Sequence, residues 1–254
     1  MKREVNIKTV RAVERALKIV SVFSFEQPEL TLSEIVEKTN LNRTTVYRLL
    51  YTLEQKRFIS YNADSGTYSL GIKFFELGGV FSSNFSEKNV IDIYLDKLMS
   101  RVNHTILVAR LFNDELLYID KRESRNELRV TSEIGRRRPP NYGILGKILM
   151  AYLSEKEIYR LLKKYPLKKY TERSITSEQV FLDTLKRIRE NGYYIAHEET
   201  MKGVVGIGAP IFKNKSIYAS FGIIAPKSIM SDQEIEECKE LVVRYSKMIS
   251  SDIG

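Results

Sequence analysis

Two helix-start signals separated by a short turn constrain the first half of this chain more than any other feature. Thr31-Leu32-Ser33-Glu34 is a capping box, in which the Thr and Glu side chains satisfy free amide groups at a helix N-terminus. It predicts a short helix that ends near Thr39. Leu41-Asn42 predicts a turn, and Asn42 is a favourable cap for a longer helix that ends near Gln55. A helix is also expected over residues 10–25, because apolar residues recur there three or four positions apart.

A polar, turn-rich segment between two apolar stretches follows these helices. Residues 58–61 and 67–70 are predicted strands, and Asn62-Ala63-Asp64-Ser65-Gly66 joins them. Three helices followed by a β-hairpin are typical of a winged helix-turn-helix, which presents the second helix of the motif to the major groove of DNA. The same order of helices also occurs as a plain packing unit. The pattern therefore favours DNA binding without requiring it.

The outer face of the helix over residues 42–55 carries basic and hydrogen-bonding side chains. No acidic residue occurs from Asn42 to Leu53, where a carboxylate would repel phosphate. Arginine binds guanine edges or phosphates, and threonine bonds bases or contacts the thymine methyl group. A net charge of +9 permits a polyanionic partner. The residues predicted to contact double-stranded DNA are Thr31, Ser33, Arg43, Thr44, Thr45, Tyr47 and Arg48, with Ser65, Gly66 and Tyr68 on the hairpin.

Four sequence runs carry a resemblance to a known family and occur in that family's order. They are Arg11-Ala12-Val13-Glu14-Arg15-Ala16-Leu17, Leu32-Ser33-Glu34-Ile35, Thr45-Val46-Tyr47-Arg48-Leu49-Leu50-Tyr51-Thr52-Leu53-Glu54 and Gly66-Thr67-Tyr68-Ser69-Leu70-Gly71. With these residues the chain resembles the IclR family of transcriptional regulators, and the resemblance resumes across the C-terminal half. It implies an operator-binding regulator that assembles as a homodimer or a dimer of dimers and responds to a small-molecule effector.

The remainder of the chain alternates segments typical of an α+β domain. Predicted strands cover residues 105–112, 115–121, 127–132, 193–196, 204–212 and 217–225, with Asn113-Asp114 as the first turn. Capping boxes at residues 154–157, 176–179 and 231–234 predict three helices. By resemblance, this half is a GAF-like effector-binding domain with a central antiparallel sheet.

The predicted fold class is therefore α+β, with three consecutive parts. A winged helix-turn-helix domain is expected over residues 1–72, and a linker with connecting helices over residues 73–102. The effector-binding domain is expected over residues 103–254. Family resemblance implies that the linker region helps to form the dimer.

Family resemblance also implies where the effector binds. The run Pro139-Pro140-Asn141-Tyr142-Gly143-Ile144-Leu145-Gly146-Lys147 matches the family's small-small-Gly-Lys motif. Ile144 and Leu145 occupy the positions of the ligand-contacting small pair. The residues that this resemblance assigns to the effector site are Tyr142, Ile144, Leu145, Ala196, Val204, Gly206, Gly222 and Ile224.

These positions lack the polar groups that orient small acids in acid-sensing members of the family. A buried carboxylate without partners is strongly unfavourable. We therefore expect that the chain does not respond to glyoxylate or pyruvate. Its effector is expected to be larger or more apolar, such as an aromatic acid or a sugar-derived molecule that uses Tyr142. In the alternative, Ile144, Leu145 and Ile224 fill the pocket, which then binds nothing.

Motifs for catalysis or cofactor binding are absent from the sequence. There is no G-x-S-x-G elbow, P-loop or dinucleotide fingerprint. His104 and His197 have no His or Cys partner at metal-ligand spacing, and Cys238 lies on the apolar face of a helix. No catalytic residue, cofactor or metal is predicted, and the chain is expected not to be an enzyme. The alternative is a small-molecule-binding or enzymatic protein whose winged domain binds another protein.

Two further features bear on partners and location. The basic runs Arg136-Arg137-Arg138 and Lys163-Lys164 are expected to lie on solvated surfaces. No apolar run reaches the roughly 18–20 residues that a membrane helix needs. A single cysteine forms no internal disulfide, so we expect a cytoplasmic protein without a membrane partner.

Overall fold

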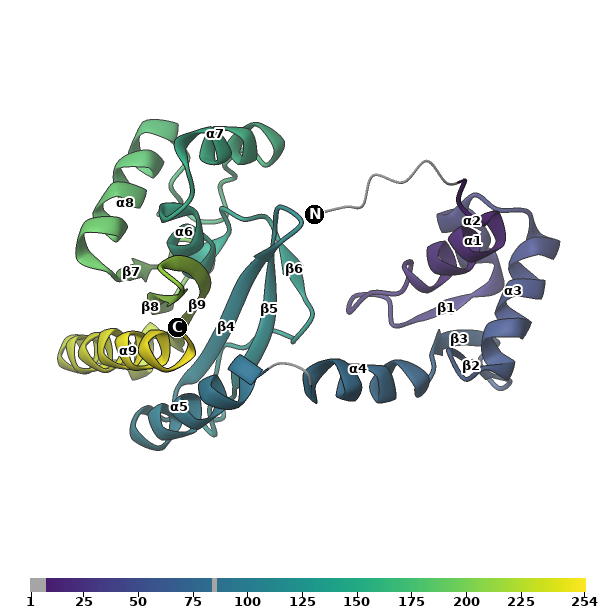
Figure 1. The fold of residues 1–254 in the computed structure, drawn as a ribbon, viewed down its shortest axis with the longest axis horizontal. Coiled ribbons are helices and arrows are strands. Elements are labelled where there is room, and N and C mark those ends of the chain that lie inside the picture. Colours follow the sequence, from purple (N-terminus) through teal and green to yellow (C-terminus); the bar gives the residue numbers. More distant parts are fainter. Residues whose placement is uncertain (1–7, 84–85) are drawn as a thin grey trace. The chain divides into compact units, whose positions relative to one another are not determined.

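A computed structural model of the chain describes residues 8–83 and 86–254 (Figure 1). Contacts divide the chain into two units, Met1–Phe85 and Ser86–Gly254. Within the described residues, no helix is both long enough and apolar enough to cross a membrane. We describe each unit by itself.

The N-terminal unit packs helices against a small antiparallel sheet. Its helices are α1 (Arg11–Val20), α2 (Leu32–Thr39), α3 (Arg43–Gln55) and α4 (Lys73–Ser83). The sheet has the order β1-β3-β2, formed by β1 (Glu29–Thr31), β2 (Ile59–Asn62) and β3 (Thr67–Leu70). Its core is formed by Ile19, Leu30, Ile35, Val46, Leu50, Ile59 and Tyr68. This is the winged helix-turn-helix that the sequence predicted.

Both predicted helix caps form in this unit. The Thr31 hydroxyl accepts a hydrogen bond from the Glu34 amide, and the Glu34 carboxylate accepts one from the Thr31 amide. Asn42 Oδ1 accepts from the Thr44 amide at 2.8 Å and begins α3. These caps fix where α2 and α3 begin, so they set the turn between the two helices.

Two expectations for this unit were wrong. The first helix ends at Val20 and not near residue 25, because a turn follows in which the amides of Ser24 and Gln27 each donate to the other's carbonyl. Strand β1, which the sequence did not predict, pairs antiparallel with β3 of the wing.

The C-terminal unit is built on one antiparallel sheet in the order β6-β5-β4-β9-β8-β7. Its strands are β4 (Thr105–Phe112), β5 (Glu115–Arg122), β6 (Arg137–Arg138), β7 (Tyr194–His197), β8 (Val204–Lys213) and β9 (Ser216–Pro226). Its helices are α5 (Ser86–Val102), α6 (Gly143–Ala151), α7 (Glu155–Lys164), α8 (Glu178–Asn191) and α9 (Asp232–Ile253), with a 3-10 turn η1 (Lys227–Ile229).

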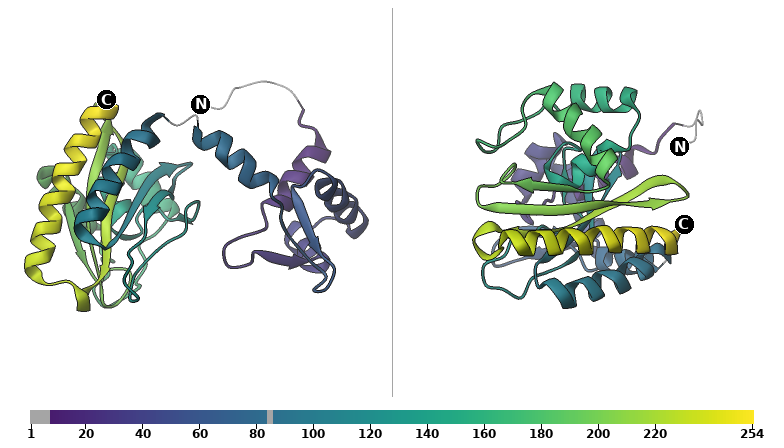
Figure 2. Two further views of the ribbon diagram at one scale, coloured as in Figure 1. Left: turned by 90° about the horizontal axis from the view of Figure 1, so that it is seen from below. Right: turned by 90° about the vertical axis from the view of Figure 1, so that its left-hand side faces the viewer.

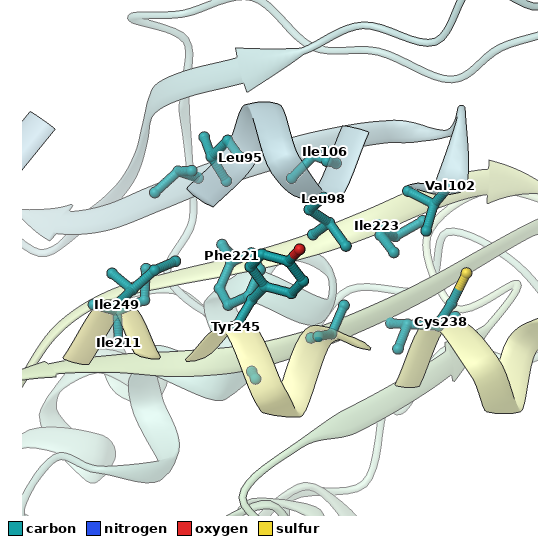
Figure 3. Packing of buried hydrophobic residues seen from close by; sticks show 14 of the residues in the cluster. Leu95, Leu98, Val102, Ile106, Ile211, Phe221, Ile223, Cys238, Tyr245 and Ile249 are labelled. Atoms are coloured by element: carbon teal, nitrogen blue, oxygen red, sulfur yellow. The ribbon is translucent and has the colours of Figure 1, made fainter. Parts of the chain in front are cut away.

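Helices cover both faces of this sheet and create two cores (Figure 2). One core lies between the sheet and the pair α5 and α9, where Leu95, Leu98, Phe221 and Tyr245 meet (Figure 3). The other lies between the sheet and α6, α7 and α8. Cys238 is 2% exposed in the first core, as predicted for a packed thiol, and burial raises its pKa to about 12.

Three expectations for this unit were wrong. Residues 127–132 form no strand, because the free edge of β5 is taken by residues 135–138 through bonds such as Gly135 N–H to the Tyr118 carbonyl. The cap of α8 is Ser177 and not Thr176. Helix α5, which the sequence placed with the linker, packs on α9, β4 and β5 and belongs to the C-terminal unit.

A β-bulge in β5 changes which side its residues face. Ala109 pairs with Tyr118 and Val108 pairs with Asp120, so Ile119 is an extra residue opposite their junction. Tyr118 and Ala109 face the core of α6, α7 and α8. Val108 faces the core of α5 and α9, and Asp120 is its partner. Tyr118 and Asp120, which are two positions apart, therefore lie on opposite faces of the sheet. In a regular strand they would share one face.

Two helical glycines predict opposite effects of substitution. A Cβ on Gly146 in α6 would lie 2.2 Å from the Pro140 carbonyl oxygen, whereas a Cβ on Gly78 in α4 would meet no atom within 4 Å. Gly146→Ala should destabilise the protein by about 1–3 kcal/mol through overpacking. Gly78→Ala should stabilise α4 by about 0.5–1 kcal/mol. Thermal unfolding followed by circular dichroism checks both; an unchanged midpoint for Gly146→Ala would contradict the close packing of α6.

Candidate functional site

Helix α3 presents a polar and aromatic face to solvent. Its opposite face is buried through Val46 and Leu50. Arg43 extends to α2, where its Nη1 donates to Ser33 Oγ at 3.2 Å. A surface hollow on the exposed face is lined by Arg15, Thr44, Thr45, Tyr47, Arg48, Leu49, Tyr51 and Thr52. Arg15 of α1 and Tyr51, which is 58% exposed, are residues of this surface that were not in the predicted set.

The wing is a tight hairpin held by its own polar groups. Asn62 Oδ1 accepts from the Asp64 amide at 3.0 Å, and the Gly66 amide donates to the Asn62 carbonyl. Gly66 has a φ of 68°, a left-handed conformation that glycine adopts without strain. Ser65 is exposed beside it, at the tip of the hairpin.

Two predicted contact residues are engaged within the protein. Tyr68 is 7% exposed and belongs to the core of the unit, where burial raises the pKa of its hydroxyl. Its ring lies 4.8 Å from that of Tyr61, which is the exposed aromatic residue of the wing. The Thr31 hydroxyl is occupied in the α2 capping box. Tyr68 is therefore removed from the predicted contact set. Side chains alternate between the two sides of a strand, and this alternation could have indicated that Tyr68 faces the core.

The C-terminal unit contains a cavity of about 170 Å³ beside the first turn of α6. Seven of the eight residues predicted for the effector site line it, namely Tyr142, Ile144, Leu145, Ala196, Val204, Gly206 and Ile224. Gly222 does not line it, because its open side lies against Ile207 and Gly208 of the neighbouring strand. Ile144, Leu145 and Ile224 form part of the wall and leave this space unfilled, so the alternative of a filled pocket is wrong.

The cavity is more polar than the sequence predicted. Its wall includes Arg136 and Arg138, which were expected on a solvated surface. The other polar side chains that line it are Tyr118, Thr131, Ser132, Tyr142, Glu199 and Thr200. Burial raises the pKa of Tyr118 to about 12, which keeps its hydroxyl a neutral hydrogen-bond donor at physiological pH. Among the predicted positions only Tyr142 has a polar side chain, and the other groups that could orient an acid come from residues outside the predicted set.

The carboxylate in the cavity wall is neutralised by the protein. Glu199 Oε2 accepts from Lys147 Nζ at 2.5 Å, and both side chains are at most 10% exposed. Tyr194 donates its hydroxyl to Glu199 Oε1 at 2.5 Å, and burial followed by this carboxylate raises the pKa of Tyr194. The Ser174 hydroxyl holds the Glu199 carbonyl at 2.7 Å. Glu199 is thus fixed by three groups and adds no unbalanced negative charge.

An ionic cluster joins β5 to α5 on the opposite face of the sheet. Asp120 accepts from Lys88 at 3.0 Å and from Arg122 at 3.0 Å, and its side chain is 6% exposed. Arg122 also binds Asp92 at 2.7 Å and Asp96 at 2.5 Å on α5. Burial raises the pKa of Asp120, and the Lys88 ammonium opposes that rise. The cluster fixes the start of α5 to a strand that also lines the cavity.

Metal-binding groups do not gather anywhere in residues 8–83 and 86–254. No group of three His, Cys, Asp or Glu side chains there could hold an ion. His104 Nε2 lies 2.8 Å from Glu234 Oε1, and His197 is the last residue of β7.

A winged helix-turn-helix joined to an α+β unit with an internal cavity defines a two-domain transcriptional regulator. Comparison with known families places it further. Residues 12–63 match the IclR helix-turn-helix domain, and residues 84–251 match the family described as bacterial transcriptional regulator IclR C-terminal. The chain belongs to the IclR family of transcriptional regulators.

Individual relatives match this chain along nearly its whole length. The HTH-type transcriptional regulator KdgR of Escherichia coli K12 is 30% identical over 96% of this chain and 94% of that protein. The HTH-type transcriptional regulator XynR of the same strain is 29% identical over 96% of this chain and 98% of that protein. An IclR regulator from Alicyclobacillus acidocaldarius matches with a TM-score of 0.86 and 25% identity, covering 97% of this chain and all of that one (100%). A homolog from Microbacterium hydrocarbonoxydans, solved with 4-hydroxybenzoate, shares the fold at 18% identity and a TM-score of 0.84, covering 95% and 98%.

Removing the buried charge of the β5–α5 cluster should destabilise the protein. Asp120→Asn leaves Lys88 and Arg122 short of one buried partner, and we expect a loss of about 1–3 kcal/mol in unfolding free energy. Asp96→Asn is the matched control, because Asp96 is 67% exposed and should contribute less than about 1 kcal/mol. Denaturant unfolding measures both; equal effects would contradict the central place of Asp120.

Proposed function

We propose that α3 is the recognition helix of a sequence-specific operator-binding protein and that the cavity of the C-terminal unit holds its effector. The observation that carries the DNA proposal is the composition of one surface. Arg48 and Thr44 share a hollow with Arg15 of a different helix, and no acidic residue occurs on α3 before Glu54. Such a surface favours phosphate and base contacts over a solvated packing face.

The remaining predicted contacts would extend this surface. Ser33 is exposed on α2 beside Arg43, and the wing carries Ser65 and Gly66 at its tip. Ser65 lies on the hairpin that would follow the backbone beside the groove. Tyr61 is a further candidate for this contact, because it is 44% exposed on the same hairpin.

Assembly through the N-terminal unit is part of the proposal. A palindromic operator requires two copies of α3 at a fixed spacing. Helix α1 exposes Val13 and Leu17, which are 54% and 59% exposed, and α4 exposes Phe75 at 80%. Exposed apolar side chains of this size on α1 and α4 suit contact with a second copy of the chain. A dimer, or a dimer of such dimers, would cover them.

Effector action would run through β5. Tyr118 lines the cavity, and Asp120 beyond the bulge holds α5. A ligand that moves Tyr118 would alter the anchoring of α5, which follows α4 in the chain. The change in DNA affinity can be no larger than the difference in ligand affinity between the two states. The solved homolog that contains 4-hydroxybenzoate supports a small molecule as the effector.

Loss of one α3 arginine should weaken specific DNA binding. Arg48→Ala is expected to cost about 1–3 kcal/mol if the guanidinium reads a base, and to lower the salt slope by ~1 if it meets phosphate only. Fluorescence anisotropy with DNA from upstream of the protein's own gene, at two salt concentrations and with competitor DNA, measures both quantities. Arg48→Lys separates the point charge from the forked guanidinium.

The matched control is Arg101→Ala, which removes the same charge from an exposed position on α5 in the other unit. It should leave DNA affinity unchanged. If Arg48→Ala and Arg101→Ala behave alike, α3 is not the recognition helix. Binding by the wild-type protein that competitor and salt both abolish would instead favour a winged domain that binds protein.

A further inference from the structure

Two basic side chains of the cavity wall come from the short edge strand β6 and from the residue just before it. Arg136 and Arg138 line the cavity, whereas Arg137 between them faces away and binds Glu115 at 3.0 Å. This alternation follows from the period of two along an extended strand. Arg136, which precedes β6, and Arg138 within it therefore both line the cavity, and Arg137 between them lies at the surface.

Arg138 is held in place by aromatic rings. Its guanidinium carbon lies 5.2 Å from the centre of the Tyr142 ring, and that ring packs edge to face on Tyr170 at 5.2 Å. Among the described residues, no carboxylate forms an ion pair with Arg138. A guanidinium over an aromatic face keeps its charge and its forked donors available for an anion.

The rest of the wall leaves this charge unbalanced. Glu199 is the carboxylate of the wall, and Lys147 already neutralises it. The wall also has an apolar part, formed by Leu107, Ile144, Leu145, Val204 and Ile224. A ligand that suits this cavity has one anionic end and an apolar body.

The size of the cavity limits that body. Its volume is about 170 Å³. An engineered apolar cavity of roughly 150 Å³ binds benzene, so a six-membered ring fits a space of this size. Two- and three-carbon acids would leave most of the apolar wall without contacts.

On these grounds we infer that the cavity is a subsite for a ring-sized monocarboxylic acid, whose carboxylate is bound by Arg138 and whose ring lies on the apolar wall. The inference rests on the proposed function, in that it assigns the chemical class of the effector to the same cavity. Tyr118 and Tyr142 supply hydroxyl groups that can bond a ring substituent.

Matched acids and amides test this assignment on the full-length protein. The probes are benzoate, 4-hydroxybenzoate and cyclohexanecarboxylate, each with its carboxamide, together with pyruvate and gluconate. Calorimetric titration and thermal shift report binding. At least one ring acid should bind, and its carboxamide should bind about 10- to 100-fold more weakly, as expected for loss of a charged hydrogen bond.

Variants of neighbouring arginines locate the charge. Arg138→Gln should weaken the ring acid by about 10- to 100-fold and leave the carboxamide unchanged. Arg137→Gln, on the same strand with the same change in charge, should bind the acid like the wild type. If Arg138→Gln unfolds at a lower temperature than Arg137→Gln, Arg138→Lys is the variant to use. It keeps the positive charge but lacks the two-pronged guanidinium, so it should still bind the acid more weakly than the wild type.

Several results would overturn the inference. They are a panel in which no ring acid binds more tightly than its carboxamide, tighter binding of pyruvate or gluconate than of every ring acid, and equal acid affinity in Arg138→Gln and the wild type. Fluorescence anisotropy with labelled DNA, measured on the same protein preparations, tests the operator-binding proposal separately from the acid subsite. Specific DNA binding without acid selectivity refutes the subsite alone, and acid selectivity without specific DNA binding refutes the operator-binding proposal alone.

Discussion

The bulge at Ile119 is the constraint on which the arrangement of the C-terminal unit depends. A regular strand would send Tyr118 and Asp120 to the same face. With one extra residue, Tyr118 joins the wall of the cavity while Asp120 reaches Lys88 on α5. The residue that lines the cavity and the residue that anchors α5 are thus two positions apart on one strand, although they lie on opposite faces of the sheet. The coupling that we propose would therefore require no extended pathway through packed side chains.

Close approach between α6 and the sheet determines where the cavity can exist. A Cβ on Gly208 would lie 2.8 Å from Ile148, and one on Gly206 would lie 3.1 Å from Ile144. Glycines in β8 therefore admit the side chains of α6, which is buried from Ile144 to Ala151. The close approach to this strand is made by a helix. Space remains beside the first turn of α6, where loops in place of a further helix complete the wall.

Local signals in the sequence predicted what local interactions determine. Thr31 and Asn42 begin their helices through bonds to residues two or three positions away, so the helix-turn-helix could be read directly. Strand β6 has two residues and exists because the edge of β5 is free. Nothing in Arg136-Arg137-Arg138 alone shows that two of the three face inward, since that depends on a partner strand distant in sequence. The polar side of the cavity was missed for this reason.

The charge of the ligand also bears on how binding could alter DNA affinity. The chain carries a net charge of +9, and an anion that binds inside the C-terminal unit lowers it by one without touching α3. Because one charge is a small part of this total, we expect the proposed regulation to act through a change in structure. The β5–α5 cluster meets this requirement, because its buried Asp120 has a defined set of partners that a shift of Tyr118 would strain. By reciprocity, operator DNA should change the affinity for the acid by the same factor.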